Sequence, residues 1–159
     1  MNELVIKRTS IFSLILGATL GLVALIPALM GLALFVLAFI CPVIIISYMR
    51  AKENFFAILD TQQGATIGGL IGFFATIGFF ISFCPMVILL HLIFKSYYTY
   101  AIPYIIQDAF WLFLIIVFMV GIMFAMTSAA VGMGVSFVMG RFLEKPKEYD
   151  APLDIKIDD

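Results

Sequence analysis

Three long stretches of the chain contain neither a charged side chain nor a histidine. They cover residues 9–49, 61–90 and 109–140. Each is longer than the ~20 apolar residues that a helix needs to cross the hydrocarbon core of a bilayer. The charged residues gather before, between and after these stretches. This pattern predicts an all-α integral membrane protein.

The first stretch is too long for a single crossing. Its 41 residues, from 9 to 49, would form a helix of about 60 Å, against a core of about 30 Å. The chain must therefore turn back, and Pro27, followed by Gly31, is the turn signal near its midpoint. We predict a tight hairpin with spans at about 10–26 and 28–49.

The other two stretches fit one long crossing each. A helix of about 30 residues measures about 45 Å, which is too short for two spans and suits one tilted or kinked helix. We place these spans at about 64–94 and 109–140, with Pro85 as the expected kink. The prediction is a four-span bundle at residues 1–142. A six-span fold with three hairpins remains an alternative.

The basic residues set the expected orientation. In a four-span fold, eight of the nine Lys and Arg residues lie on one side and Lys95 lies on the other. The positive-inside rule then places both termini in the cytoplasm. A six-span fold would put all nine inside, so charge does not separate the two topologies. The first apolar run exceeds a 7–15-residue signal-peptide core, which favours an uncleaved anchor. The eight residues on one side are Lys7, Arg8, Arg50, Lys52, Arg141, Lys145, Lys147 and Lys156.

Composition strengthens the membrane assignment and removes several function classes. The chain is 64% hydrophobic and 12% charged, with a net charge of −1 and a mean hydropathy of +1.18. A soluble domain is about 25% charged. The low net charge and the lack of a basic patch argue against nucleic-acid binding. Two cysteines do not form a disulfide framework.

The connecting segments suggest interfacial roles. The pattern at residues 50–63 predicts a short amphipathic helix at the membrane surface. The external link at 95–108 holds four tyrosines, with Trp111 just beyond it. An aromatic belt explains these rings, and stacking on a sugar or an aromatic compound is the alternative. The acidic tail at 143–159 is expected to be disordered in the cytoplasm.

Small residues at helical spacing form the most specific motif. Gly64, Gly68 and Gly72 are four residues apart and therefore share one helix face, as in a glycine zipper. The first span has a shorter pair, Gly17 and Gly21. Faces of this kind let helices approach closely, so helix packing is the expected role; a narrow conduit or a homo-oligomer interface are alternatives. The last span has a matching stripe of Gly121, Ala125, Ser128, Gly132, Ser136 and Gly140.

One short sequence occurs twice. The segment Gly-Ala-Thr-Leu-Gly at 17–21 resembles Gly-Ala-Thr-Ile-Gly at 64–68, and a further glycine, Gly31 or Gly78, follows at the same offset. Two-repeat construction is common in transporters. Chance matches are also easy in a chain so rich in glycine and alanine. Duplication and coincidence both stay open.

Few residues are candidates for chemistry. His91 is the sole histidine and lies near the outer end of the third predicted span, while Asp108 is placed to cap the last one. We expect no catalytic residues, no metal and no cofactor, because no catalytic or metal-binding motif is present. Proton- or sodium-driven transporters usually place an ionisable group near mid-membrane, and no carboxylate, Lys or Arg lies within a predicted span.

These observations predict a non-catalytic protein of the cell membrane. The expected role is that of a structural or accessory subunit, in contact with the lipid bilayer and with a second copy or another membrane protein. Compact size and charge asymmetry favour a bacterial cytoplasmic membrane. The alternative is a transporter or channel component for a neutral or apolar solute. A membrane enzyme that acts on lipid through His91 and Asp108 is a third, weaker hypothesis.

Overall fold

The computed structural model describes residues 3–53, 61–94 and 108–143, and the elements within these ranges are helices. Four of the helical segments are long and apolar enough to cross a membrane: Ile6–Val23, Pro27–Met49, Thr61–Ile93 and Phe110–Arg141. The predicted number of long helices is therefore confirmed. The ends of the predicted surface helix at 50–63 belong to the long helices on either side of it, because residues 50–53 continue the second span and residues 61–63 begin the third. Residues 54–60, residues 95–107 of the tyrosine-rich link and residues 144–159 of the acidic tail lie outside the described residues.

The first two spans form the predicted hairpin around Pro27. Helix α1 covers Glu3–Val23, and α2 begins at Pro27. Pro27 occupies the first turn of α2, where its missing N–H costs no hydrogen bond and its fixed φ suits the helix. The turn occupies residues 24–26, so the first span ends three residues before the predicted limit of 26.

The second span has an internal irregularity that the sequence pattern did not predict. It consists of α2 (Pro27–Phe35), a π-helical turn η1 (Val36–Ile40) and α3 (Cys41–Glu53), which follow one another without a break. In η1, the N–H of Cys41 donates to the carbonyl of Val36, five residues earlier. Pro42 lies two residues after the end of this turn and has no N–H of its own. A π-bulge next to a proline is a recognised way for a helix to bend.

The third and fourth spans are single helices of 34 residues each. Helix α4 covers Thr61–Phe94 and includes Pro85, and α6 covers Phe110–Leu143. Neither folds back on itself, so the hairpins that a six-span fold requires in these regions are absent from residues 61–94 and 110–143. The observed helices begin or end within three residues of the predicted spans at 64–94 and 109–140.

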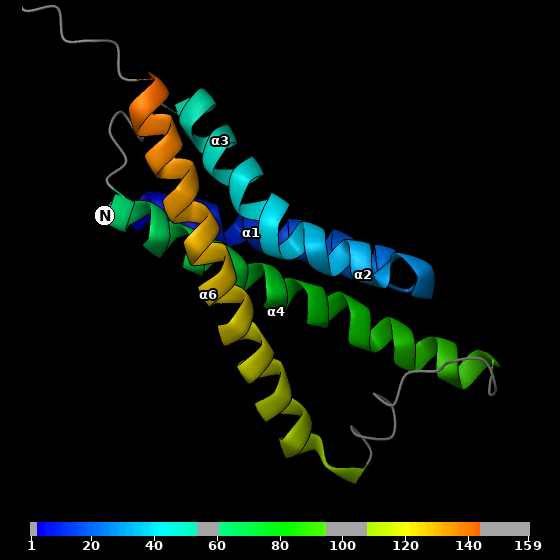
Figure 1. Cartoon of the computed structure of the whole chain (residues 1–159). Helices are drawn as coiled ribbons and strands as arrows, with labels where there is room; N and C mark the ends of the chain where they lie inside the picture. Colours follow the sequence, from blue (N-terminus) through cyan, green and yellow to red (C-terminus); the bar gives the residue numbers. More distant parts are fainter. Residues whose placement is uncertain (1–2, 54–60, 95–107, 144–159) are drawn as a thin grey trace, which may run out of the picture.

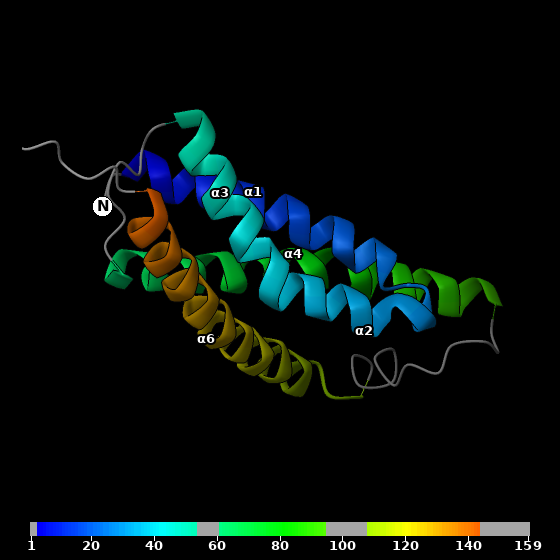
Figure 2. The same cartoon turned by 45° about the horizontal axis from the view of Figure 1, so that its top comes forward.

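Helix α4 is the central element. It lies along α1, crosses α6, and contacts η1 and α3 (Figures 1 and 2). Leu14 of α1 meets Gly78 of α4, and Ala18 meets Ser82 one turn later, so α1 and α4 run parallel. The contacts between α4 and α6 run in the opposite order. These directions are those expected of the first, third and fourth crossings in a four-span fold.

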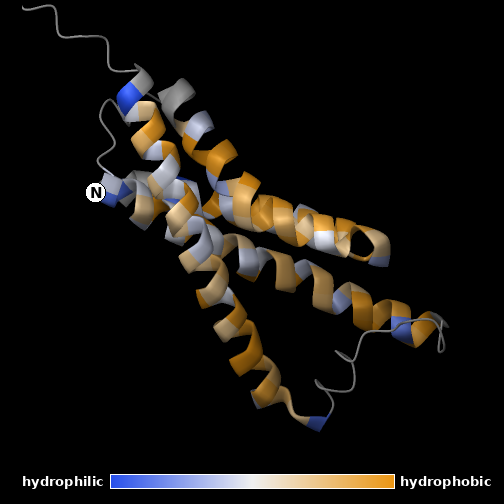
Figure 3. Cartoon of the chain, viewed as in Figure 1, coloured by the Kyte–Doolittle hydropathy of each residue, from blue (hydrophilic) through white to orange (hydrophobic). Residues whose placement is uncertain are grey.

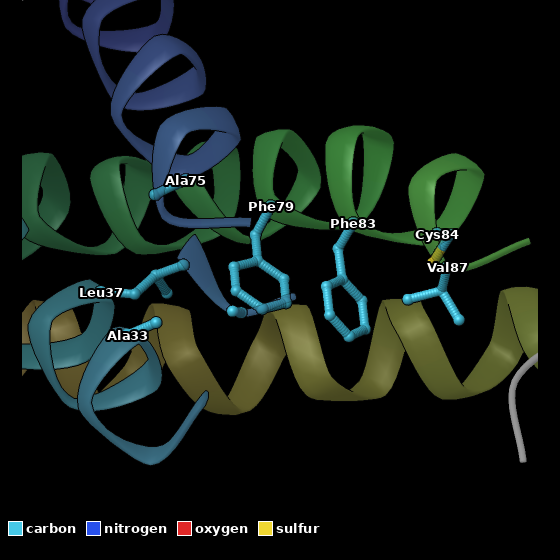
Figure 4. Packing of buried hydrophobic residues seen from close by; sticks show 8 residues of the cluster. Ala33, Leu37, Ala75, Phe79, Phe83, Cys84 and Val87 are labelled. Atoms are coloured by element: carbon cyan, nitrogen blue, oxygen red, sulfur yellow. The ribbon is translucent and has the colours of Figure 1, made fainter. Parts of the chain in front are cut away.

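Two groups of buried apolar side chains lie along α4. One joins Ile67 and Ile71 of α4 to Ile45, Ile46 and Met49 of α3. In the other, the stacked rings of Phe79 and Phe83, with centroids 5.3 Å apart, pack with Ala33 of α2 and Leu37 of η1 (Figure 4). The hairpin of the first two spans is therefore held against α4 at both ends.

The outer surface of the helices is also apolar. Trp111 and Met126 on α6 are 78% and 71% exposed, and many other large apolar side chains are exposed. Figure 3 shows hydrophobic residues along the full length of the helices and strongly hydrophilic ones near their ends. A surface of this kind is stable in hydrocarbon and costly in water.

Candidate functional site

The contact between α4 and α6 is built on glycines whose backbones nearly touch. A methyl group added at Gly68 would overlap the carbonyl oxygen of Ser128 and lie 3.0 Å from Cα of Gly132. One turn later, a methyl group at Gly72 would lie 2.6 Å from the carbonyl oxygen of Phe124. One turn earlier, Gly64 lies against Gly132 and Ser136. The structure thus brings the three glycines of α4 onto the part of α6 that holds Ser128, Gly132 and Ser136.

Toward the start of α6 the two helices diverge, and aromatic rings take the place of backbone contact. A methyl group added at Gly121 would meet only the ring of Phe73, at 3.4 Å. Ring pairs fill the widening space: Phe73 with Phe118 at 6.2 Å, and Phe80 with Phe113 at 6.4 Å. Ala125 is half-buried, next to Gly69, and an added methyl group at Gly140 would meet no atom within 4 Å. The predicted stripe on α6 therefore makes close contact only over its middle part.

A second close contact joins α4 to α1. Methyl groups added at Gly17 and Gly21 would overlap or crowd the backbone of Ala75 and Phe79, and one at Gly78 would crowd the backbone of Leu14. Gly17 and Gly21 were predicted to be packing positions, whereas their partners on α4 were not predicted. The sequence does contain a pattern that indicates this face of α4, because small residues at 75, 78 and 82 follow helical spacing. Small residues at the same spacing are buried along α1 and in the first residue of the turn after it: Thr9, Ser13, Gly17, Gly21 and Ala24.

Two serines hydrogen-bond from one helix to another. The hydroxyl of Ser82 on α4 donates to the carbonyl of Ala18 on α1, at 2.7 Å. The hydroxyl of the fully buried Ser128 on α6 donates to the carbonyl of Ala38 in η1, at 3.1 Å. In a regular α-helix, Ala38 would accept its bond from residue 42, which is a proline without an N–H. Ser128 thus supplies a donor to the carbonyl that Pro42 cannot serve.

The polar side chains that are buried within the described residues are hydroxyls of Ser and Thr. The buried hydroxyls of Ser13 and Thr76 donate to carbonyls four residues earlier in their own helices, as does the exposed hydroxyl of Thr66. The hydroxyl oxygens of Thr9 and Ser136 are buried without a hydrogen-bond partner in the structure. The interior therefore uses its polar groups chiefly to bond helix backbone.

The two candidates for chemistry are not brought together. His91 is half-buried in α4, three residues before its end. Asp108 is exposed, and it lies one residue before Ala109, whose carbonyl accepts the first bond of α6. The residue at the capping position of α6 is therefore Ala109, one residue after Asp108, for which this role was predicted. The end of α4 and the start of α6 lie apart in both views (Figures 1 and 2).

The cysteines are free and buried, Cys41 in α3 and Cys84 in α4. Within the part of the chain that the structure describes, no group of three His, Cys, Asp or Glu side chains lies close enough to hold a metal ion. Arg141, at the end of α6, has its guanidinium 6.0 Å from the ring centre of Phe137. These groups form no constellation for acid–base or nucleophilic chemistry.

The repeated pentapeptide does not mark two equivalent structural units. The first copy, at 17–21, lies near the end of α1 and faces α4, whereas the second, at 64–68, lies near the start of α4 and faces α6. The matched glycines differ as well, because a methyl group added at Gly31 would meet no atom of another part of the chain within 4 Å, whereas one added at Gly78 would crowd the backbone of Leu14. The structural surroundings favour coincidence over duplication.

Function has to be argued from these contacts alone. No protein family, characterised protein or solved structure matches this chain.

Proposed function

We propose that the chain is a four-span membrane protein that acts as a non-catalytic structural or accessory subunit, with both termini in the cytoplasm. Four long apolar helices with a lipid-compatible surface support insertion in a bilayer. The excess of Lys and Arg on one side supports the orientation. Compact size and this charge asymmetry lead us to propose a bacterial cytoplasmic membrane, with a second copy or another membrane protein as partner.

The observation that carries the proposal is the position of α4, which is fixed by backbone contact on two faces. Its glycines meet the backbone of α6 on one face and of α1 on another. In lipid, helices associate through van der Waals contact and interhelical hydrogen bonds, since apolar side chains gain little by leaving the hydrocarbon. An interior built in this way suits a rigid scaffold. A helix locked on two faces is poorly suited to the rocking motion of a transporter.

The substitution Gly68→Leu tests the packing role. A leucine side chain would force α4 away from Ser128 and Gly132, so we expect loss of the folded, monodisperse protein in detergent. Gly134→Leu is the matched control, because an added Cβ there meets no atom within 4 Å. If both variants purify and assemble like the wild type, the packing role of α4 is wrong.

Solute flux separates the proposal from its alternative. Proteoliposomes that contain the wild-type chain should release uncharged solutes no faster than empty liposomes. Protein-dependent flux that Gly134→Leu retains and Gly68→Leu abolishes would instead favour a transport component for neutral or apolar solutes.

A further inference from the structure

The first hairpin has an open apolar pocket on its outer side, between α1 and α3. Its volume is about 240 Å³. Most of its lining side chains are partly exposed, whereas Ile45 at its floor is buried. It is thus a slot in the surface that would face lipid. The lining consists of Phe12, Ile15, Leu16, Ile44, Ile45 and Tyr48.

The lining of this pocket is apolar, and a basic side chain lies beyond one end of it. Arg8 is exposed and lies four residues before Phe12 and seven before Ile15, which places it on the same face of α1. The ring of Tyr48, on α3, contacts the ring of Phe12 with centroids 5.4 Å apart. Arg8 and Tyr48 therefore lie at the same end of the slot. This is also the end at which α1 begins and α3 ends.

We infer that this slot is a binding site for an anionic glycerophospholipid, an inference that rests on the membrane insertion proposed above. An acyl chain lies against the apolar walls, and the headgroup phosphate receives hydrogen bonds from the Arg8 guanidinium and the Tyr48 hydroxyl. An arginine suits a phosphate because its planar fork donates two hydrogen bonds at once. Long basic side chains near helix ends also extend toward the headgroups.

The shape of the site favours a lipid over a helix of another protein. A transmembrane partner helix needs an apolar contact that continues across the bilayer. The slot is lined by residues from about one turn of each helix, 12–16 and 44–48, and the positive charge of Arg8 beyond its end matches a negatively charged headgroup. Basic pockets between transmembrane helices on the cytoplasmic side bind anionic lipids in this manner.

Quenching of a tryptophan in the slot by brominated lipids tests the inference in the full-length chain. The background variant is Trp111→Phe, since Trp111 is the single tryptophan. Phe12→Trp places the probe in the slot, and Phe35→Trp places it on the exposed surface of α2. Each protein is reconstituted with phosphatidylglycerol or phosphatidylcholine brominated at the same acyl position. The ratio of quenching by the two lipids is then independent of the depth of the tryptophan in the bilayer.

We expect phosphatidylglycerol to quench Phe12→Trp with an apparent association constant about fivefold higher than that of phosphatidylcholine. The two lipids should quench Phe35→Trp equally. Adding Arg8→Gln should remove the preference in the slot. Lys7→Gln should keep the preference. This substitution also removes one positive charge, but from the adjacent face of α1, away from the slot.

Equal quenching by both lipids at Phe12→Trp would overturn the inference and leave the proposed function intact. Equal loss of preference in Lys7→Gln and Arg8→Gln would also overturn it, because general attraction to the surface would then suffice. Protection of Phe12→Trp from both lipids, with normal quenching at Phe35→Trp, would show that a protein fills the slot. Absence of quenching at both positions would refute membrane insertion itself.

Discussion

Replacing Ser128 should reveal whether α6 compensates for the hydrogen bond that Pro42 cannot make. Ser128 is fully buried, and its hydroxyl lies 3.1 Å from the carbonyl oxygen of Ala38. Ser128→Ala removes this bond and leaves its Cβ in place against Gly72. Interhelical hydrogen bonds in membrane proteins contribute about 0.6 kcal/mol on average and up to about 1.7 kcal/mol. We expect a loss of about 1 kcal/mol, because the acceptor is buried and has lost its usual donor.

The decisive measurement is a double-mutant cycle with Pro42→Ala. Alanine restores an N–H at position 42, which can then donate to Ala38 as in a regular α-helix. Ser128→Ala should therefore cost about 0.3 kcal/mol or less in the Pro42→Ala protein, an interaction energy of about 0.7 kcal/mol. The free energy of unfolding is measured by titration with denaturing detergent in mixed micelles, followed by circular dichroism.

Thr127→Val is the matched control on the same helix. Its hydroxyl donates to the carbonyl of Met123 within α6, so its effect should not depend on residue 42. If Ser128→Ala costs the same in the wild-type chain and in the Pro42→Ala chain, the proposed compensation is wrong. If Thr127→Val couples to position 42 as strongly as Ser128→Ala, the coupling reflects a general rearrangement of the helices.

Further predictions concern glycine contacts and topology. Gly78→Ala should lower the free energy of unfolding by roughly 1–3 kcal/mol, because its methyl group meets the backbone of Leu14, whereas Gly134→Ala should have no cost. Gly121→Ala should stay within about 0.5 kcal/mol of the wild type, since it meets only the Phe73 ring. Thermal unfolding of these variants can be followed with a thiol-reactive dye, because both cysteines are buried in the folded protein. Each kcal/mol of lost stability should lower Tm by about 2–4 °C. A Gly78→Ala protein as stable as the Gly134→Ala protein would contradict the α1–α4 contact. In a cysteine-free background, Ile26→Cys should react with a membrane-impermeant reagent outside intact cells and Asp158→Cys only after lysis; the reverse pattern would refute the proposed orientation.

Much of the helical layout follows from local properties of the chain. The lengths of the chargeless stretches, set against bilayer thickness, predicted four long helices, and Pro27 predicted the turn between the first two. The spacing of Gly64, Gly68 and Gly72 placed them on one face, because helical periodicity depends on sequence separation alone. These inferences needed no knowledge of which helices meet.

The tertiary structure decided which small residues matter and what they touch. Gly68, Gly78 and Gly134 all lie in apolar stretches of the sequence. A methyl group added at Gly68 or Gly78 would nevertheless meet the backbone of another helix, whereas one added at Gly134 would meet no atom within 4 Å. Their difference depends on where two helices cross, and this is fixed by the packing of all four spans. The bond from Ser128 to Ala38 joins residues 90 positions apart. Such a contact has no local signature, because a hydroxyl can bond its own helix or a neighbour with similar energy, and only the fold determines which carbonyl is near.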